Sequence, residues 1–162
     1  MTVRLVPAAA NHQRWIRDKL QSYLAELSRF GPIGQNPEGT YEYPYLDHYW
    51  REPDRHPFVI HLDNAAVGFL LVRKDMNPVD GSDLMEIAEL YILPAFRQHS
   101  VATRAIKEVV SYFPGNWRAA VLPNNDVAYS FWQQLISALD PAFTVTAPAS
   151  SRNPQFVFTF QA

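Results

Sequence analysis

The fold is decided by the stretch Glu89-Leu90-Tyr91-Ile92-Leu93-Pro94-Ala95-Phe96-Arg97-Gln98-His99-Ser100-Val101-Ala102. Its first part is apolar and closes with a proline, which predicts a buried strand over 84–93. Apolar side chains then recur with a period near 3.6, which predicts a helix that begins around His99 or Ser100 and ends before Pro114. A strand, a short loop and a helix start therefore follow one another directly.

The start of this helix is suited to binding an anion. Backbone N–H groups in the first turn of a helix have no partner within the helix, and the helix dipole is positive at that end. Ser100 and Ala102 are small, so phosphate oxygens could approach the main chain closely. The pattern fits a pyrophosphate site, and it fits an ordinary turn between a strand and a helix equally well.

The remaining patterns predict a mixed α/β (α+β) architecture. Helices are expected from Asn11 to Phe30 and, after Asn125, as far as Leu139. The aromatic-rich segment 41–50 predicts a loop followed by a short helix. About four helices should therefore flank a largely antiparallel sheet, with a tight turn at Asp63-Asn64 and a Pro/Ser loop between the last two strands. The six further strands are expected at 2–6, 57–62, 65–73, 117–122, 142–147 and 155–160.

Composition and length exclude several classes of protein. The chain has 162 residues, 48% of them apolar, which predicts one domain over 1–162. A net charge of −2 without a basic cluster argues against a nucleic-acid partner. There are no cysteines, so thiolate metal sites and a cysteine nucleophile are excluded, and the five scattered histidines predict no metal site. No stretch is long and apolar enough for a signal peptide or a membrane span, so we expect a soluble cytoplasmic protein with no membrane partner.

The loop at 97–102 resembles the signature loop of the GCN5-related N-acetyltransferase (GNAT) family. That loop reads Arg/Gln-x-x-Gly-x-Gly/Ala and follows a strand that ends in an apolar-x-Pro turn. Arg97, Val101 and Ala102 match it, with Ile92-Leu93-Pro94 in front, and Ser100 replaces the central glycine. The resemblance implies a GNAT-type fold in which a bulge in a central strand opens a V-shaped cleft for acyl-CoA.

A second GNAT motif occurs at the expected separation. It consists of an Asn, an Ala three residues later and an aromatic pair, matched here by Asn125, Ala128 and Phe131-Trp132. The segment 41–50 and the same aromatic pair are also similar to a bacterial subgroup of predicted acetyltransferases. The resemblance leaves two roles open for Asn125, which would either contact the arm of acetyl-CoA or cap the helix that follows.

The resemblance also implies how acetyl-CoA, as co-substrate, would be held. Its pantetheine arm would pair with the backbone of the strand end, with the Ile92 amide near the thioester oxygen as an oxyanion-type donor. Its pyrophosphate would lie on the N–H groups of 98–103. The residues implied in cofactor binding are Tyr91, Ile92, Leu93, Arg97, Gln98, His99, Ser100, Val101, Ala102, Thr103, Asn125 and Trp132.

Acetyl transfer to an amine requires a base, and the candidates are Glu86 and Glu89. A primary amine has a pKa near 10, so it must lose a proton before it attacks. Residues three apart point to opposite faces of a regular strand, so we expect only one of the two glutamates to face the cleft. The family's usual acid is a Tyr at the position of Trp132, and Tyr129, one turn earlier, is the candidate substitute or a core residue.

The acceptor site is expected around Phe30, Tyr43 and Tyr45, where the family binds its acceptor. Acidic residues accompany these aromatics, and an acidic, aromatic pocket suits a cationic amine, whether a small molecule or a peptide. A homodimer is plausible by analogy with related enzymes.

Two functional hypotheses follow from the sequence. The first is an N-acetyltransferase acting by direct attack in a ternary complex. The second is a non-catalytic GNAT-fold module that binds acyl-CoA or a protein, and it is favoured by Ser100, which is strained if its φ is positive, and by Trp132.

Overall fold

The structure is a computed structural model that describes residues 1–149 and 154–162. Within these described residues, seven strands form one sheet in the order β1-β2-β3-β4-β5-β7-β6, in which β4 and β5 are parallel neighbours and the other neighbours are antiparallel. The strands are β1 (Val3–Pro7), β2 (Arg55–Leu62), β3 (Ala65–Met76), β4 (Asp83–Ile92), β5 (Asn116–Val121), β6 (Thr144–Thr146) and β7 (Phe156–Gln161). The predicted mixed, largely antiparallel sheet is confirmed.

Three α-helices and three short 3₁₀-helices accompany the sheet. The α-helices are α1 (Gln13–Leu27), α2 (Val101–Tyr112) and α3 (Asp126–Leu139), and the 3₁₀-helices are η1 (Ala10–His12), η2 (Leu46–Trp50) and η3 (Pro94–Phe96). The short helix expected within 41–50 is thus the 3₁₀-helix η2, so the described chain has three α-helices where about four helices were expected. The predicted Pro/Ser loop falls partly on 150–153, outside the described residues. None of the described helices has the length and apolarity needed to cross a membrane.

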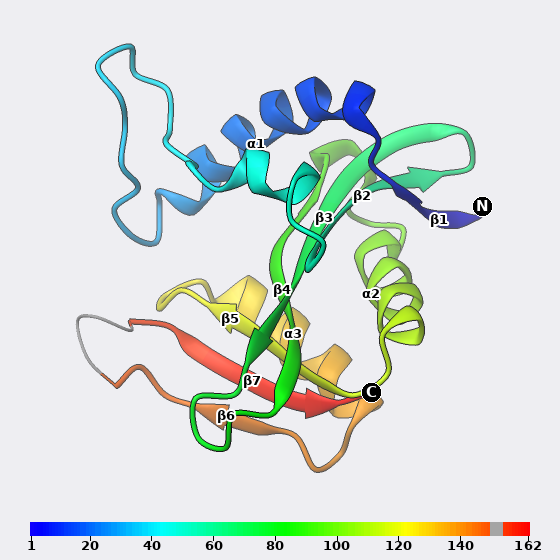
Figure 1. Cartoon of the computed structure of the whole chain (residues 1–162), viewed down its shortest axis with the longest axis vertical. Helices are drawn as coiled ribbons and strands as arrows, with labels where there is room; N and C mark the ends of the chain where they lie inside the picture. Colours follow the sequence, from blue (N-terminus) through cyan, green and yellow to red (C-terminus); the bar gives the residue numbers. More distant parts are fainter. Residues whose placement is uncertain (150–153) are drawn as a thin grey trace.

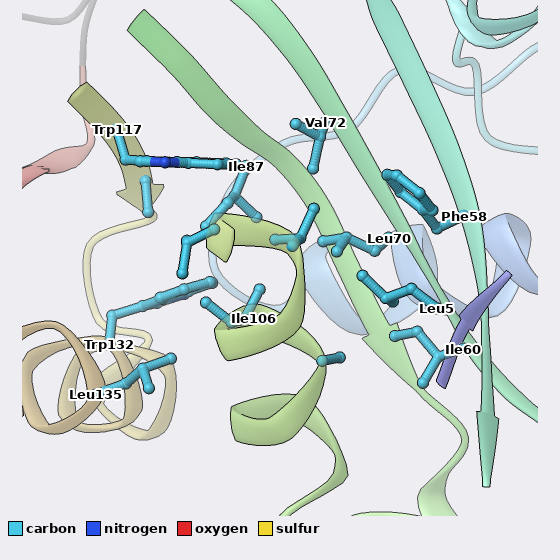
Figure 2. Packing of buried hydrophobic residues seen from close by; sticks show 14 of the residues in the cluster. Leu5, Phe58, Ile60, Leu70, Val72, Ile87, Ile106, Trp117, Trp132 and Leu135 are labelled. Atoms are coloured by element: carbon cyan, nitrogen blue, oxygen red, sulfur yellow. The ribbon is translucent and has the colours of Figure 1, made fainter. Parts of the chain in front are cut away.

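Apolar side chains fill both faces of the sheet, because successive residues of a strand point to opposite sides. On one face Ile87 and Trp117 pack with α2 and α3, and Figure 2 shows Trp132 of α3 and Ile106 of α2 next to each other below Trp117. On the other face α1 and η2 cover β2, β3 and β4, as Figure 1 shows. Both layers therefore hold β4 in the middle of the molecule.

The central strands β4 and β5 diverge after a short parallel stretch. Their pairing is confined to Met85–Ile87, which face 117–119 of β5. Directly after this stretch the β3–β4 register shifts, because Val72 pairs with Ile87 but Leu71 pairs with Glu89. Ala88 is therefore an extra, bulged residue, and such a bulge bends and twists its strand. The second half of β4 loses β5 as a neighbour at this point.

Candidate functional site

The end of β4 presents one main-chain group to its open edge. The Leu93 N–H donates to the Val67 oxygen of the preceding strand at 2.8 Å, so it is directed toward β3. Successive N–H groups of a strand alternate between its two edges, which directs the Ile92 N–H toward the side that β5 has left. Of Tyr91, Ile92 and Leu93, the three residues expected to pair with a pantetheine arm, Ile92 is thus the one whose amide faces the open edge.

Beyond this edge, the chain reaches the N-terminus of α2 through a strained residue. Ser100 is the N-cap of α2 and has φ +54 and ψ +26, in the left-handed region. The question left open by the sequence is therefore decided in favour of positive φ, where a Cβ atom is unfavourable. The Ser100 side chain makes no capping hydrogen bond, so it leaves the first-turn N–H groups of Val101, Ala102 and Thr103 available for an anion. Gln98 and His99 are exposed in the same loop.

Arg97 ties the loop to helix α1. Its Nε donates to the Ile92 oxygen at 2.9 Å, and its Nη2 donates to both carboxylate oxygens of Glu26, at 2.8 and 2.9 Å. The guanidinium also lies 5.4 Å from the centre of the Tyr91 ring. The side chain of Arg97 therefore stabilises the strand end and the loop, and any role in binding phosphate falls to backbone groups.

Glu89 is a partly buried carboxyl at the bulge. The Tyr43 hydroxyl donates to its Oε1 at 3.3 Å, and the Tyr23 hydroxyl of α1 faces the same carboxyl. Burial raises the pKa of Glu89 to about 7, helped by the nearby charge of Glu86, while the two tyrosine hydrogen bonds act in the opposite direction. A carboxyl of this kind exchanges its proton near neutral pH.

Glu86 lies on the same face as Glu89, so the expectation that the two point to opposite faces is wrong. The extra residue Ala88 changes the alternation by one position, and it places both carboxyls on the side of α1. Their surroundings nevertheless differ. Glu86 accepts from the Nη2 atoms of Arg73 and Arg118, each at 2.7 Å, and is mostly buried between them.

Comparisons with known proteins agree with this geometry. The model of the acetyltransferase (GNAT) family matches residues 20–135. The chain belongs to the GNAT family. This match spans the bulged strand β4, the loop before α2 and most of α3.

Solved structures share the GNAT fold at low sequence identity. An acetyltransferase from Thermus thermophilus is 14% identical with a TM-score of 0.68, and the match covers 100% of this chain and 98% of that one. Arabidopsis thaliana Naa50 in complex with the bisubstrate analogue CoA-Ac-MVNAL is 13% identical with a TM-score of 0.63, covering 100% of both chains. AAC(6')-Iy in complex with a bisubstrate analogue of CoA and acetylneamine is 18% identical with a TM-score of 0.57, covering 83% and 90%. No curated protein sequence matches the chain.

The second GNAT motif has mainly structural contacts here. Asn125 caps α3, since its Oδ1 accepts from the Ala128 N–H at 3.2 Å, which is one of the two roles left open. Trp132 is 7% exposed and belongs to the core between α2 and α3. The Tyr129 ring lies 5.1 Å from the ring of Phe156 on β7, a distance typical of aromatic packing.

Phe30, Tyr43 and Tyr45, the three acceptor-site residues expected from the sequence, lie in different surroundings in this GNAT chain. Tyr43 reaches Glu89, while Tyr45 is 57% exposed and lies beside His48 on the surface. Phe30 is partly buried just after the end of α1. A surface hollow of about 590 Å³ lies between α1 and the loop that follows it, and it is lined by Arg17, Gln21, Asn36, Thr40, Tyr41, Glu42, Tyr43 and Pro44.

Two residues near Glu89 escaped the sequence analysis. The hydroxyl of Tyr23, on α1, meets Glu89 across 66 positions of sequence. Tyr49 of η2 is buried close to Glu89, and burial raises the pKa of Tyr49 to about 12. Helical spacing identified Tyr23 as inward-facing, but no local signal connected either tyrosine to β4.

Proposed function

We propose that this GNAT chain is an N-acetyltransferase, which transfers the acetyl group of acetyl-CoA to an amine by direct attack in a ternary complex. The observation that carries the proposal is the position of Glu89. Its carboxyl lies at the bulge where β4 leaves β5, three residues before the open amide of Ile92. A base and a candidate oxyanion donor thus occupy the same half of one strand.

Two features of the structure support acetyl-CoA as the co-substrate. The uncapped first turn of α2 offers the N–H groups of 101–103 to a pyrophosphate, and no basic side chain is needed there. The open edge at Ile92 can add an extended chain through main-chain hydrogen bonds. Two of the neighbouring structures hold bisubstrate analogues that contain CoA, which supports the same ligand class for this chain.

We assign the role of general base to Glu89. The acceptor amine must lose a proton, and a base is most effective when its pKa lies near the working pH. Burial raises the pKa of Glu89 to about 7, so the carboxylate form is populated near neutral pH and still binds a proton appreciably. Glu86 is the weaker candidate, because the Nη2 atoms of Arg73 and Arg118 already bind its Oε2 atom, each at 2.7 Å.

The reaction itself forms an amide C–N bond and breaks the thioester C–S bond. The electron pair of the broken bond leaves with the CoA sulfur, and the amine proton goes to Glu89. A free thiol has a pKa of about 8.5, so the thiolate is a tolerable leaving group near neutral pH. We therefore require no proton donor, and we assign the packed Tyr129 no catalytic role.

The acceptor is an amine, either a small molecule or a peptide. Naa50 and AAC(6')-Iy were solved with analogues carrying a peptide and an aminoglycoside-type acceptor, respectively. In this chain the hollow beside α1 is lined by amide, hydroxyl and carboxylate groups and by the guanidinium of Arg17. Asp47 pairs with Arg17 at 2.5 Å and offsets its charge, while Glu42 supplies a negative charge to the lining that suits a cationic amine.

The test combines calorimetry with a thiol-release assay. Wild-type protein should bind acetyl-CoA with a free energy near −8 kcal/mol, about micromolar, and release CoA with at least one member of a panel of amines and peptides. Glu89→Gln should keep this affinity and lower kcat by roughly 10²–10⁴-fold. Binding without turnover on any acceptor would favour the non-catalytic module that binds acyl-CoA. No binding to acetyl-CoA would overturn the acetyltransferase and leave the protein-binding module.

A further inference from the structure

Tyr43 connects the loop after α1 to the carboxyl of Glu89. Its hydroxyl donates to Glu89 Oε1 at 3.3 Å, although the two residues lie 46 positions apart in sequence. Its ring packs against the core on the α1 side of the sheet. This contact joins a loop residue to a residue of the central strand.

Helix α1 fixes the main chain two residues before Tyr43. The Gln21 side-chain amide donates to the Tyr41 oxygen and accepts from the Tyr41 N–H, both at 2.8 Å. A side chain that satisfies both main-chain groups of one residue holds that residue much as a neighbouring strand would. Gln21 therefore sets where the following residues leave the surface of α1.

The segment before Tyr43 is a hairpin that projects outward between the end of α1 and η2 (Figure 1). Gln35 and Tyr41 form a β-bridge, and the Glu42 N–H donates to the Gly34 oxygen at 2.9 Å. This hairpin, residues 34–42, forms one wall of the hollow beside α1, and Tyr43 lines the same hollow. Tyr43 thus stands between the hollow and Glu89.

We propose that Tyr43 is a positioning residue, which orients the Glu89 carboxylate by its hydroxyl and links the hairpin 34–42 to that carboxylate. This role rests on the proposed function of Glu89 as base. Tyr43 itself exchanges no proton in the reaction. Tyr43 lines the hollow and also contacts Glu89, so an acceptor bound in the hollow would act on the base through Tyr43.

The groups that face Glu89 come from three elements besides its own strand. Tyr23 lies on α1, Tyr43 on the loop and Tyr49 on η2, while Glu86 precedes it on β4. Burial and the charge of Glu86 favour the protonated carboxyl, and the hydrogen bonds from Tyr23 and Tyr43 favour the ionised one. Removal of the Tyr43 hydroxyl should therefore raise the pKa of Glu89.

The experiment titrates the Glu89 carboxyl directly, so it requires no turnover. The side-chain carboxyls of protein labelled with ¹³C-glutamate are followed by NMR from pH 4 to 9, and the Glu89 signal is the one that is lost in Glu89→Gln. Tyr43→Phe should raise the titration midpoint of Glu89 by about half a pH unit, since one hydrogen bond to a carboxylate is lost. Tyr41→Phe is the matched control, because its hydroxyl contacts Ser28 instead of Glu89 and the midpoint should stay in place.

A second variant and a kinetic measurement complete the test. Gln21→Met keeps Tyr43 but removes both bonds to Tyr41, so it should move the Glu89 midpoint in the same direction. In the acetyl-transfer assay, Tyr43→Phe should shift the acid limb of the pH profile of kcat to higher pH. A Glu89 midpoint that moves by less than about 0.2 unit in Tyr43→Phe would overturn the proposal, even if the protein proves to be an active acetyltransferase.

Discussion

Gly68 of β3 lies so close to Tyr91 of β4 that a Cβ atom on Gly68 would be 2.2 Å from the Tyr91 oxygen. Real Cβ atoms do not approach backbone oxygens at this distance, and the neighbouring Ile92 leaves no alternative space, with its Cα at 3.2 Å. Gly68 pairs with Ile92 and thus supports the strand end that presents the open amide. The absence of a side chain at position 68 permits this close approach of β3 to the candidate site.

Gly68→Ala should therefore destabilise the protein and displace the end of β4. We expect a loss of about 2–3 kcal/mol in urea unfolding, the size typical of overpacking against backbone. Gly31→Ala is the matched control, because a Cβ there would meet Leu122 at an ordinary 3.9 Å, and its effect should stay within about 0.5 kcal/mol. Equal unfolding midpoints for the two variants would contradict the tight contact.

Ser100→Gly should stabilise the loop that precedes α2. A left-handed conformation is unfavourable for serine by about 1–2 kcal/mol. Glycine removes this steric cost, but it also increases the conformational entropy of the unfolded chain. We expect a net gain of about 0.5–1 kcal/mol in thermal unfolding and tighter binding of acetyl-CoA by a few-fold in calorimetry. Ser100→Ala keeps the strain and removes the hydroxyl, so its stability should equal that of the wild type. Weaker acetyl-CoA binding by Ser100→Gly would show that the serine hydroxyl itself contributes.

The raised pKa of Glu89 should make stability fall between about pH 4.5 and 7. Its pKa is raised from 4.5 to about 7 by burial, so in this window the folded protein holds a proton that the unfolded chain releases. Each pKa unit corresponds to about 1.36 kcal/mol, so the free energy of unfolding should be lower by up to about 3 kcal/mol above pH 7 than below pH 4.5.

Glu89→Gln should remove this pH-dependent loss. It should therefore be more stabilising at pH 8 than at pH 5 in urea unfolding, and the difference between the two proteins isolates Glu89 from other carboxyls. Asp75, whose pKa is lowered by hydrogen bonds and by its arginine neighbours, contributes equally to both proteins. The exposed Glu38→Gln should show the same small effect at both pH values. A difference in unfolding free energy between wild type and Glu89→Gln that stays constant from pH 5 to pH 8 would argue against a raised pKa of Glu89.

Glu86→Gln should lower stability more than it lowers catalysis. Glu86 is 16% exposed and neutralises Arg73 and Arg118, so its removal leaves two partly buried cations that share Asp75. We expect a loss of about 1–3 kcal/mol at pH 7, since an uncompensated buried charge is unfavourable.

A surface ion pair supplies the control for this variant. Asp83 pairs with Lys74 at 3.3 Å and is 71% exposed, so Asp83→Asn should change stability by less than about 0.5 kcal/mol. The thiol-release assay then separates the two glutamates. A fall in kcat for Glu86→Gln as deep as that for Glu89→Gln, with stability unchanged, would identify Glu86 as the base.

The strand and helices that form the site could be predicted from the sequence, because their patterns depend on residues that are close along the chain. The apolar run before Pro94 and the period of 3.6 after Ser100 predicted β4 and α2 to within one or two residues. The Asn125 motif marked the start of α3, where its side chain caps the helix. Strand alternation and helix periodicity are local properties, so these patterns survive folding unchanged.

The sequence by itself determined the family, the order of the elements and the loop that precedes α2. The tertiary structure decided which side chains meet, because the contacts of Tyr23 and Tyr43 with Glu89 join segments 66 and 46 positions apart. It also decided the orientation of Glu86, since the bulge at Ala88 arises from the register of β3 against β4. Strict alternation along the strand placed Glu86 and Glu89 on opposite faces, and one extra residue in the pairing brought them to the same side.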